Sequence, residues 1–320
     1  MIREIDMNRS SSLERFLQAR KKARRGALAT RLKGQDASLQ LLPFDMIRSE
    51  LRQQSPFYRG IQEVPIDQIV GSVGRYNEFT RHFLPLNDSL AERWVGVDTL
   101  ARTEGWPPVE LYKVGNAYFV RDGNHRVSVA RQMDIPTIEA HVWEYPDDLE
   151  IGPNDTLDDV LIRLGERNFF EKTHLDEMYP DHNLHFTVPG RHTEMLVQIY
   201  DLQKTLAVID GEMMSFPEAV AAWYEMIYLP TIQIIRESGL LQEFPGRTEA
   251  DLFGWLSKHR DALRKRYGDY ESLHDLAAML IQYYKEGTLD KAARQFRRLL
   301  GSNELPPLPE ALADEVDEEE

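Results

Sequence analysis

The sequence predicts an α+β protein in which a small domain built on a β-sheet precedes a mostly α-helical domain. Between about residues 61 and 143, short runs rich in β-branched and aromatic residues alternate with turn residues and one helical pattern. From Asp155 onward, apolar residues recur at helical spacing. The chain has 320 residues, of which 42% are hydrophobic, and this length suffices for about two domains that each bury a core.

The individual elements are expected from local patterns. Gly115 and Asn116 indicate the turn of a β-hairpin, and Asp122 to Asn124 interrupt its second strand before a helix. The order strand, helix, hairpin, turn, helix, strand indicates a mixed α+β arrangement. The strands are expected at 61–66, 109–114, 117–120 and 138–142, and helices at 12–32, 45–52, 127–133, 155–164, 191–208, 216–238, 248–267 and 272–287.

In the helical half we expect two interruptions of helices and one row of aromatic side chains along a helix. Residues 165–168 are expected to interrupt a helix, and Pro230 to kink or end another. The aromatic residues from Trp223 to Tyr228 recur at helical spacing, which is more typical of core than of a ligand site.

One polar cluster in the helical half has two interpretations. It comprises Arg247, Glu249, Asp251, Trp255, His259 and Arg260. If a helix begins near Thr248, then Asp251, Trp255 and His259 share a face that could line a pocket. The favoured alternative is a capping aspartate, a core tryptophan and a surface histidine.

Composition limits the class of protein. No run approaches the ~18 to 20 apolar residues of a membrane span. Residues 1–6 lack the apolar core of a signal peptide, so we expect a cytoplasmic protein without a membrane span. The absence of cysteine excludes disulfides, thiolate metal sites and a cysteine nucleophile. Any metal would therefore be held by oxygen or imidazole, and its identity stays unknown.

Charge is unevenly distributed. The chain carries a formal net charge of −15, yet residues 1–52 hold 12 Lys and Arg against 6 Asp and Glu. We therefore distinguish a basic N-terminal helical segment (1–52), an α+β domain (53–150), a helical domain (151–305) and an acidic tail (306–320) that is expected to be disordered.

The basic segment is expected to form a helix over 12–32, because Ser11 to Glu14 have capping-box spacing. One face would carry Leu13, Phe16, Leu17, Ala27 and Leu28, and the other the basic cluster of Arg20, Lys21, Lys22, Arg24 and Arg25. The commoner explanation of such a cluster is the solvated side of a docked amphipathic helix. The alternative is a contact for DNA or RNA, anionic lipid or an acidic partner.

The motif with the most chemical content runs from Asp122 to Arg126. Gly123 permits a tight turn, and the following helix directs unsatisfied N–H groups and its positive dipole end toward that turn. Arg126 supplies a planar fork suited to phosphate, and His125 a donor that titrates near neutral pH. Asp122 could hold a divalent ion, orient His125 or cap the helix. The plain alternative is an ordinary turn followed by an ordinary helix start.

The run from Trp106 to Arg131, followed by Ile135 and Pro136, resembles the ParB/sulfiredoxin superfamily. In that superfamily a Gly-x-x-Arg box after the hairpin binds nucleotide phosphates. The resemblance covers roughly a quarter of the chain and implies a mixed sheet with flanking helices and a nucleoside triphosphate, CTP or ATP, bound with Mg. Arg75 falls where relatives place a phosphate-contacting residue, although it could equally be a surface loop arginine.

Departures from the relatives limit what the resemblance implies. Asn124 stands where sulfiredoxin has its nucleophilic cysteine, so sulfinic-acid reduction is excluded. No convincing helix-turn-helix follows the domain. In the serine-kinase relatives an acidic residue near the first strand is the base, and Glu63 or Asp67 could stand there. The region from Trp223 to Leu252 resembles an uncharacterised bacterial family that joins a ParB-like domain to such a helical region, which implies architecture and no activity.

These observations lead to one leading hypothesis, a regulatory nucleotide-phosphate-binding protein for which hydrolysis stays open. Its phosphate-binding residues would be Arg75, Gly123, Asn124, His125 and Arg126, and its catalytic candidates His125, Asp122 and Glu63. One alternative is a nucleic-acid-binding regulator that uses the basic cluster. Another is a small-molecule kinase with Glu63 or Asp67 as base. A homodimer is compatible with each of them.

Overall fold

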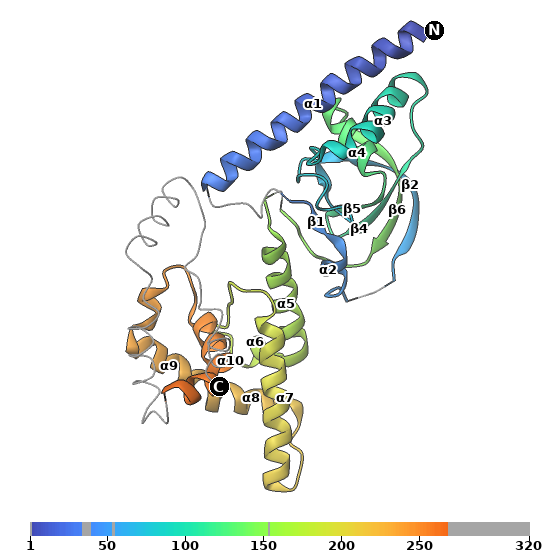
Figure 1. Ribbon diagram of the computed structural model, residues 1–320. Coiled ribbons are helices and arrows are strands. Elements are labelled where there is room, and N and C mark those ends of the chain that lie inside the picture. Colours follow the sequence, from blue (N-terminus) through green and yellow to red (C-terminus); the bar gives the residue numbers. More distant parts are fainter. Residues whose placement is uncertain (1, 34–39, 53–54, 153, 268–320) are drawn as a thin grey trace, which may run out of the picture. The chain divides into compact units, whose positions relative to one another are not determined.

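The computed structural model describes residues 2–33, 40–52, 55–152 and 154–267. The chain divides into two compact units, Met1–Val160 and Leu161–Glu320. The first unit contains a six-stranded sheet with flanking helices, and the described part of the second contains helices (Figure 1). The expected α+β class is confirmed. The predicted helix at 272–287 and the acidic tail lie outside the described residues.

The sheet is mixed. Its strand order is β1-β3-β5-β4-β6-β2, in which β4 pairs antiparallel with β5 and β6 pairs antiparallel with β2, while the other three pairings are parallel. The predicted hairpin is confirmed as β4 and β5, with Gly115 and Asn116 between them. The strands are β1 Leu42–Pro43, β2 Phe57–Pro65, β3 Ile69–Ser72, β4 Val109–Val114, β5 Ala117–Asp122 and β6 Thr137–Tyr145.

The two faces of the sheet are covered differently. Alternation along β4 and β6 turns Val109, Leu111 and Val142 toward α3 (Ala91–Thr103) and α4 (Asn124–Gln132), where Trp94 joins the same core. The opposite face meets the short helix α2 (Phe44–Arg48), whose Phe44 stacks on Tyr112 at a centroid distance of 4.8 Å. The short 3-10 turns η2 (Ile66–Gln68) and η3 (Asp88–Leu90) complete this unit.

The N-terminal helix α1 (Ile2–Lys33) begins ten residues earlier than expected, so the capping-box interpretation of Ser11 to Glu14 is wrong. The predicted apolar face is right for Phe16 and wrong for its three leucines. Phe16, Ala19 and Ala23 are buried, whereas the leucines at 13, 17 and 28 are exposed. The docked face also carries Ser12, Arg15 and Arg20, because the carboxylates of Asp98 and Asp88 give these polar side chains partners.

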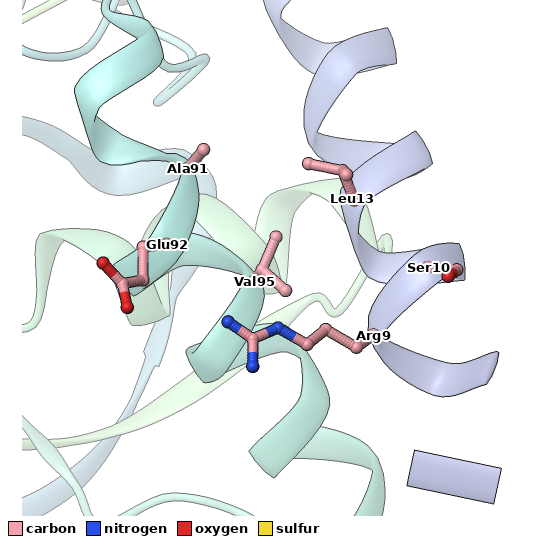
Figure 2. A pocket seen from close by; sticks show the side chains of 6 residues that line it. All are labelled: Arg9, Ser10, Leu13, Ala91, Glu92 and Val95. Carbon is pink, nitrogen blue, oxygen red and sulfur yellow. The ribbon is translucent and has the colours of Figure 1, made fainter. Parts of the chain in front are cut away.

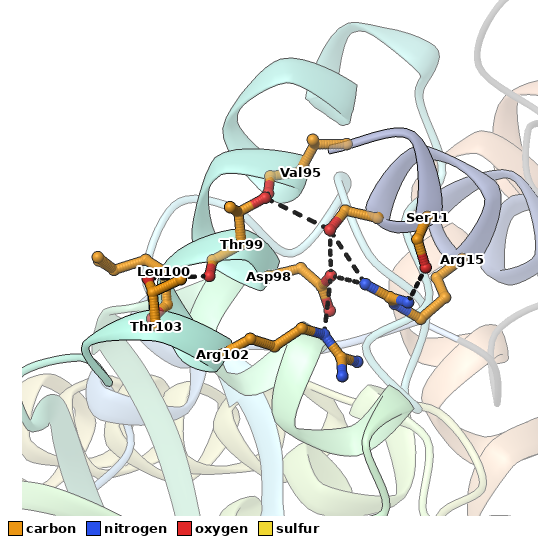
Figure 3. Close-up of polar contacts among 9 residues, drawn as sticks. Ser11, Arg15, Val95, Asp98, Thr99, Leu100, Arg102 and Thr103 are labelled. Carbon is orange, nitrogen blue, oxygen red and sulfur yellow. Dashed lines mark hydrogen bonds and ion pairs between the residues drawn. The ribbon is translucent and has the colours of Figure 1, made fainter. Parts of the chain in front are cut away.

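A buried carboxylate joins α1 to α3. Asp98 accepts hydrogen bonds from the Ser12 hydroxyl (2.5 Å) and from the Arg15 guanidinium, and the Arg102 Nε lies 3.6 Å from it (Figure 3). Burial alone raises the pKa of Asp98, but the bonds from Arg15 and Ser12 outweigh burial and hold the pKa below its ordinary value. Asp98 therefore remains ionised, and its hydrogen bonds join α1 to α3.

We expect Asp98→Ala to loosen α1 from α3. The substitution leaves a serine hydroxyl and an arginine without their buried partner, which should cost about 2 to 3 kcal/mol. Hydrogen exchange along α1 measures the effect. Glu104→Ala is the matched control, because it removes the same charge from the exposed C-cap position of α3. Unchanged protection of α1 in Asp98→Ala would show that the carboxylate does not hold the helix.

In the described part of the second unit, up to residue 267, the regular elements are helices. Residues 165–168 lie inside α5, so the predicted helix break is wrong; Gly165 lies against the buried His192, and the helix passes it uninterrupted. Its elements are α5 Leu157–Thr173, α6 Leu175–Met178, α7 Arg191–Asp210, α8 Phe216–Trp223, the π-helical η4 Tyr224–Tyr228, α9 Leu229–Ser238, the 3-10 turn η5 Leu240–Glu243 and α10 Glu249–Tyr267.

The aromatic stripe is core, as predicted. Trp223, Tyr224 and Tyr228 are buried and pack with Phe253. Pro230 neither ends nor interrupts the helical path. It occupies the start of α9 directly after the π-helical turn, where the hydrogen-bond pattern has already changed and its missing N–H is tolerated.

The favoured interpretation of the polar cluster is confirmed where the structure describes it. Asp251 and Thr248 cap α10 reciprocally, with both bonds at 3.0 Å, and Trp255 is buried in the core. Asp251 also accepts a bond from the Thr187 hydroxyl at 2.6 Å. The side chains of His259 and Arg260 lie outside the described residues.

Candidate anion-binding site

The predicted turn between β5 and α4 is confirmed. Gly123 stands at the N-cap of α4 with φ of +110°, a backbone conformation that favours glycine. An added Cβ there would lie 2.6 Å from Val109 Cγ1. No side chain caps this helix, so the N–H groups of its first turn stay available to a ligand.

A small pocket opens at this turn. Its volume of about 90 Å³ fits a phosphate-sized anion but not a whole nucleotide, which needs a site of about 300 Å³ or more. The lining residues come from the loop after β3, from α3, from the end of β5 and from the start of α4. They are Val73, Arg75, Arg93, Val97, Arg121, Asp122, Gly123, Asn124, His125 and Arg126.

Two buried side chains of the pocket lack partners. Asn124 is 4% exposed and His125 5%, yet Asn124 Oδ1 and His125 Nδ1 have no hydrogen-bond partner among the described residues. An unsatisfied buried polar atom typically costs ~1 to 3 kcal/mol. Two such atoms side by side in sequence at a helix N-terminus indicate that a ligand or water satisfies them.

His125 is neutral at pH 7, which corrects the expectation that it titrates near neutral pH. Burial, with smaller contributions from the Arg93 and Arg75 guanidinium groups, lowers its pKa to about 4. The histidine ring also packs edge-on against Phe79 at 5.4 Å. In the free protein His125 is therefore a neutral hydrogen-bonding group, and the positive charge of the pocket comes from arginine.

The arginines are engaged to different degrees. Arg75 pairs with Glu78 at 2.8 Å, and Arg121 lies 3.5 Å from Glu110. Arg93 is exposed, and the described ranges give it no ion pair or side-chain hydrogen bond. Sequence patterns did not indicate Arg93, because α3 brings it to the pocket only through the tertiary fold. Arg121 was also not predicted, although it directly precedes the motif.

The guanidinium group of Arg126 is not free to bind phosphate, as the motif had suggested it would be. Its Nη1 donates to the carbonyl oxygens of Pro107 and Pro108, both at 2.8 Å, and its Nη2 pairs with Asp122. Arg126 thus braces the turn against the start of β4. Asp122 does not cap α4, since its carboxylate is committed to this pair.

The sheet does not bring Glu63 to the pocket. Glu63 lies on the edge strand β2, and strands β4 and β6 stand between β2 and β5, a separation of about 14 Å at ~4.8 Å per strand. Asp67 belongs to η2 and does not line the pocket either. A base from this region has no geometric support.

The expected Mg finds no suitable donor set. Mg²⁺ is typically held by one or two carboxylates together with substrate phosphates. The single lining carboxylate, Asp122, is paired with Arg126 among four arginines. Within the part of the chain that the structure describes, no group of three or more His, Asp or Glu could hold a metal ion. These residues therefore do not fit a protein-held Mg.

The basic cluster on α1 is smaller than predicted. Arg20 is buried and donates to Asp88 at 2.8 Å, and Arg24 lies 3.3 Å from the same carboxylate. Arg20 is thus unavailable to nucleic acid, which corrects that assignment. Lys21, Lys22 and Arg25 are exposed, and their role in nucleic-acid binding stays a prediction.

A larger groove of about 480 Å³ lies between α1 and α3 (Figure 2). Arg9, Ser10 and Leu13 line it from α1, and Ala91, Glu92 and Val95 from α3. Its polar lining residues are Arg9, Ser10 and Glu92, so its single cation is matched by one carboxylate. Its chemistry therefore gives no reason to prefer it to the anion pocket.

No protein-family model matches this chain, and comparison with curated proteins gives no significant match. The resemblance to the ParB/sulfiredoxin superfamily accordingly stays a prediction. Among the helices of the described ranges, none combines the length and apolar character needed to cross a membrane.

Proposed function

We propose that the first unit binds the phosphate groups of a nucleotide at the turn between β5 and α4. The observation that carries the proposal is the buried, unpartnered His125 Nδ1 beside the uncapped N-terminus of α4, in a pocket lined by four arginines. An anion would add the charge that this pocket lacks. The nucleotide as carrier of the phosphate rests on the sequence resemblance from Trp106 to Pro136.

Each residue has a distinct part in this proposal. The N–H groups at the start of α4 donate to phosphate oxygens, and the helix dipole favours the negative charge. His125 contributes a donor when its neutral ring carries the proton on Nδ1. Arg93 and Arg75 neutralise charge from α3 and the loop after β3. Arg126 positions the turn through Pro107 and Pro108.

The proposal concerns binding and regulation. A general base would need a carboxylate or a histidine free to accept a proton near the phosphate. Asp122 is paired with Arg126, Glu63 lies on the far edge of the sheet, and His125 is a weak base because burial lowers its pKa to about 4. Binding energy is therefore the quantity to measure first.

We expect Arg93→Ala to weaken binding of tripolyphosphate, CTP and ATP by about 10-fold or more, because a charge-assisted hydrogen bond contributes ~1.5 to 3 kcal/mol. Arg93→Lys should recover part of the loss, since the charge remains but the fork does not. Isothermal titration calorimetry with each ligand measures the change.

Lys204→Ala serves as the charge control, because it removes one positive charge from an exposed position of α7. Its affinities should equal those of the wild type. If Arg93→Ala also bound all three ligands with wild-type affinity, the pocket would not be the anion site. A salt-sensitive mobility shift with random DNA or RNA tests the nucleic-acid alternative in parallel.

A further inference from the structure

One side of the long helix α7 carries a row of four exposed residues. Val197 and Val208 lie at the two ends of this row and are 53% and 85% exposed. Asp201 and Lys204 lie between them and are exposed as well. The four residues follow one another at spacings of four, three and four, so they share one face of the helix. We call this set the α7 row.

The α7 row lies on the side of the helix that faces away from the core of the second unit. Met195 and Ile199 on the opposite side of α7, the yellow helix of Figure 1, are buried in that core. Tyr200, at the margin of the α7 row, stacks on Phe216 with a centroid distance of 4.9 Å. The core contacts of α7 therefore leave the α7 row open to a further partner.

The two charges of the α7 row have no counterpart in the part of the chain that the structure describes. Neither the Asp201 carboxylate nor the Lys204 ammonium group has an ion pair or a side-chain hydrogen bond with any described residue. The two valines at the ends of the row leave apolar surface in water. An exposed helix face of this composition gains stability when a partner offers opposite charges at its centre and apolar groups at its ends.

The order valine, aspartate, lysine, valine is complementary to its own reverse. If a second copy of α7 lies antiparallel to the first, Val197 lies opposite Val208 of the partner subunit, and Asp201 lies opposite Lys204 of the partner subunit. Each contact occurs twice, because the two chains of a two-fold interface exchange roles. A parallel pair would place like charges opposite each other at both central positions, which is unfavourable.

We propose that two copies of this protein associate through the α7 row, as an antiparallel pair of α7 helices. The valines provide apolar contact at both ends, and the two pairs of Asp201 with Lys204 fix the register and the antiparallel direction. The α7 row spans about 16 Å at ~1.5 Å per residue, so the interface is small and the dimer reversible. None of the four residues lines the anion pocket, and the inference is independent of the proposed function.

Charge reversal tests the pairing of Asp201 with Lys204. In Asp201→Lys and in Lys204→Glu, both central pairs become like-charged, so the dimer dissociation constant of each variant should rise by roughly 10-fold or more. An equimolar mixture of the two variants should form a heterodimer with about the affinity of the wild-type dimer, because a basic row then faces an acidic one. Sedimentation equilibrium of the full chain at several protein concentrations measures all three.

Lys172→Glu is the matched control, since it reverses the same charge at an exposed position of α5 in the same unit. It should dimerise as the wild type does. A wild type that stays monomeric at every concentration would overturn the proposal, and so would dimerisation of Lys204→Glu with wild-type affinity. Circular dichroism checks that both reversed variants are folded. If they are folded and their mixture still stays monomeric, a second copy is not the partner of the α7 row.

Discussion

Gly123→Ala should destabilise the first unit by about 2 to 5 kcal/mol and remove anion binding. Two costs combine in this estimate. A non-glycine residue at φ of +110° is strained by ~1 to 3 kcal/mol, and a Cβ placed 2.6 Å from the buried Val109 forces the core to move. The movement would also displace the start of α4, from which the proposed N–H donors project.

Gly105→Ala separates the cost of the positive φ from the cost of the contact with Val109. Gly105 also has a positive φ, +77°, but an added Cβ there meets no atom within 4 Å. This variant should lose only about 1 kcal/mol and retain anion binding. Urea unfolding, followed by hydrogen exchange in β5 and α4, compares the two variants. Equal losses would mean that the contact with Val109 has no energetic importance.

Both units should lose stability as the pH falls from 7 to 5, by about 2 kcal/mol for each deeply buried histidine. His125 in the first unit and His192 in the second each have a pKa lowered to about 4, in both cases mainly by burial. For His192 the nearby His185 adds to the effect.

The sign of this dependence comes from the unfolded chain. Unfolded histidine takes up a proton near pH 6.5, whereas the folded, buried ring does so only near pH 4. Between these values the unfolded state binds more protons, so stability is fully present above pH 6.5 and declines toward pH 4. Urea unfolding of His125→Gln and His192→Gln should show a shallower pH dependence in the unit that carries the change.

Tripolyphosphate should shift one of these two pKa values and leave the other. A bound polyanion beside His125 favours the protonated ring, so the pKa of His125 should rise from about 4 toward its ordinary value. His192 lies in the other unit and is the internal reference. Nuclear magnetic resonance titration of the two imidazoles follows both. No change at His125 under saturating ligand would place the anion elsewhere.

Local signals made part of this molecule predictable. Gly115 and Asn116 specify a tight turn between two apolar runs, and Gly123 specifies the change from strand to helix. These features depend on residues adjacent in the chain, so the hairpin and the turn between β5 and α4 could be located from sequence. Thr248 and Asp251 marked the start of α10 for the same reason.

Features that depend on distant partners were not predictable in this way. Arg93 precedes the motif by 29 residues and reaches the pocket only because α3 packs beside α4. The guanidinium of Arg126 was expected to bind phosphate, but its Nη1 donates to the carbonyl oxygens of Pro107 and Pro108. The helical spacing of apolar residues in α1 assigned its docked face to leucines. That spacing does not reveal that α3 presents the carboxylate of Asp98 to Ser12.

The π-helical turn at Tyr224–Tyr228 fixes the phase of the helix that follows it. Each residue of an α-helix turns the chain by about 100°, so deleting one residue within the turn would restore regular winding and rotate all of α9 by that angle. Ile232 and Ile235, now buried, would leave the core, and polar neighbours would replace them. The additional residue that the π-helical turn contains therefore determines which side chains of α9 face the core. Insertions and deletions in this short segment should be tolerated far less than substitutions on its exposed side.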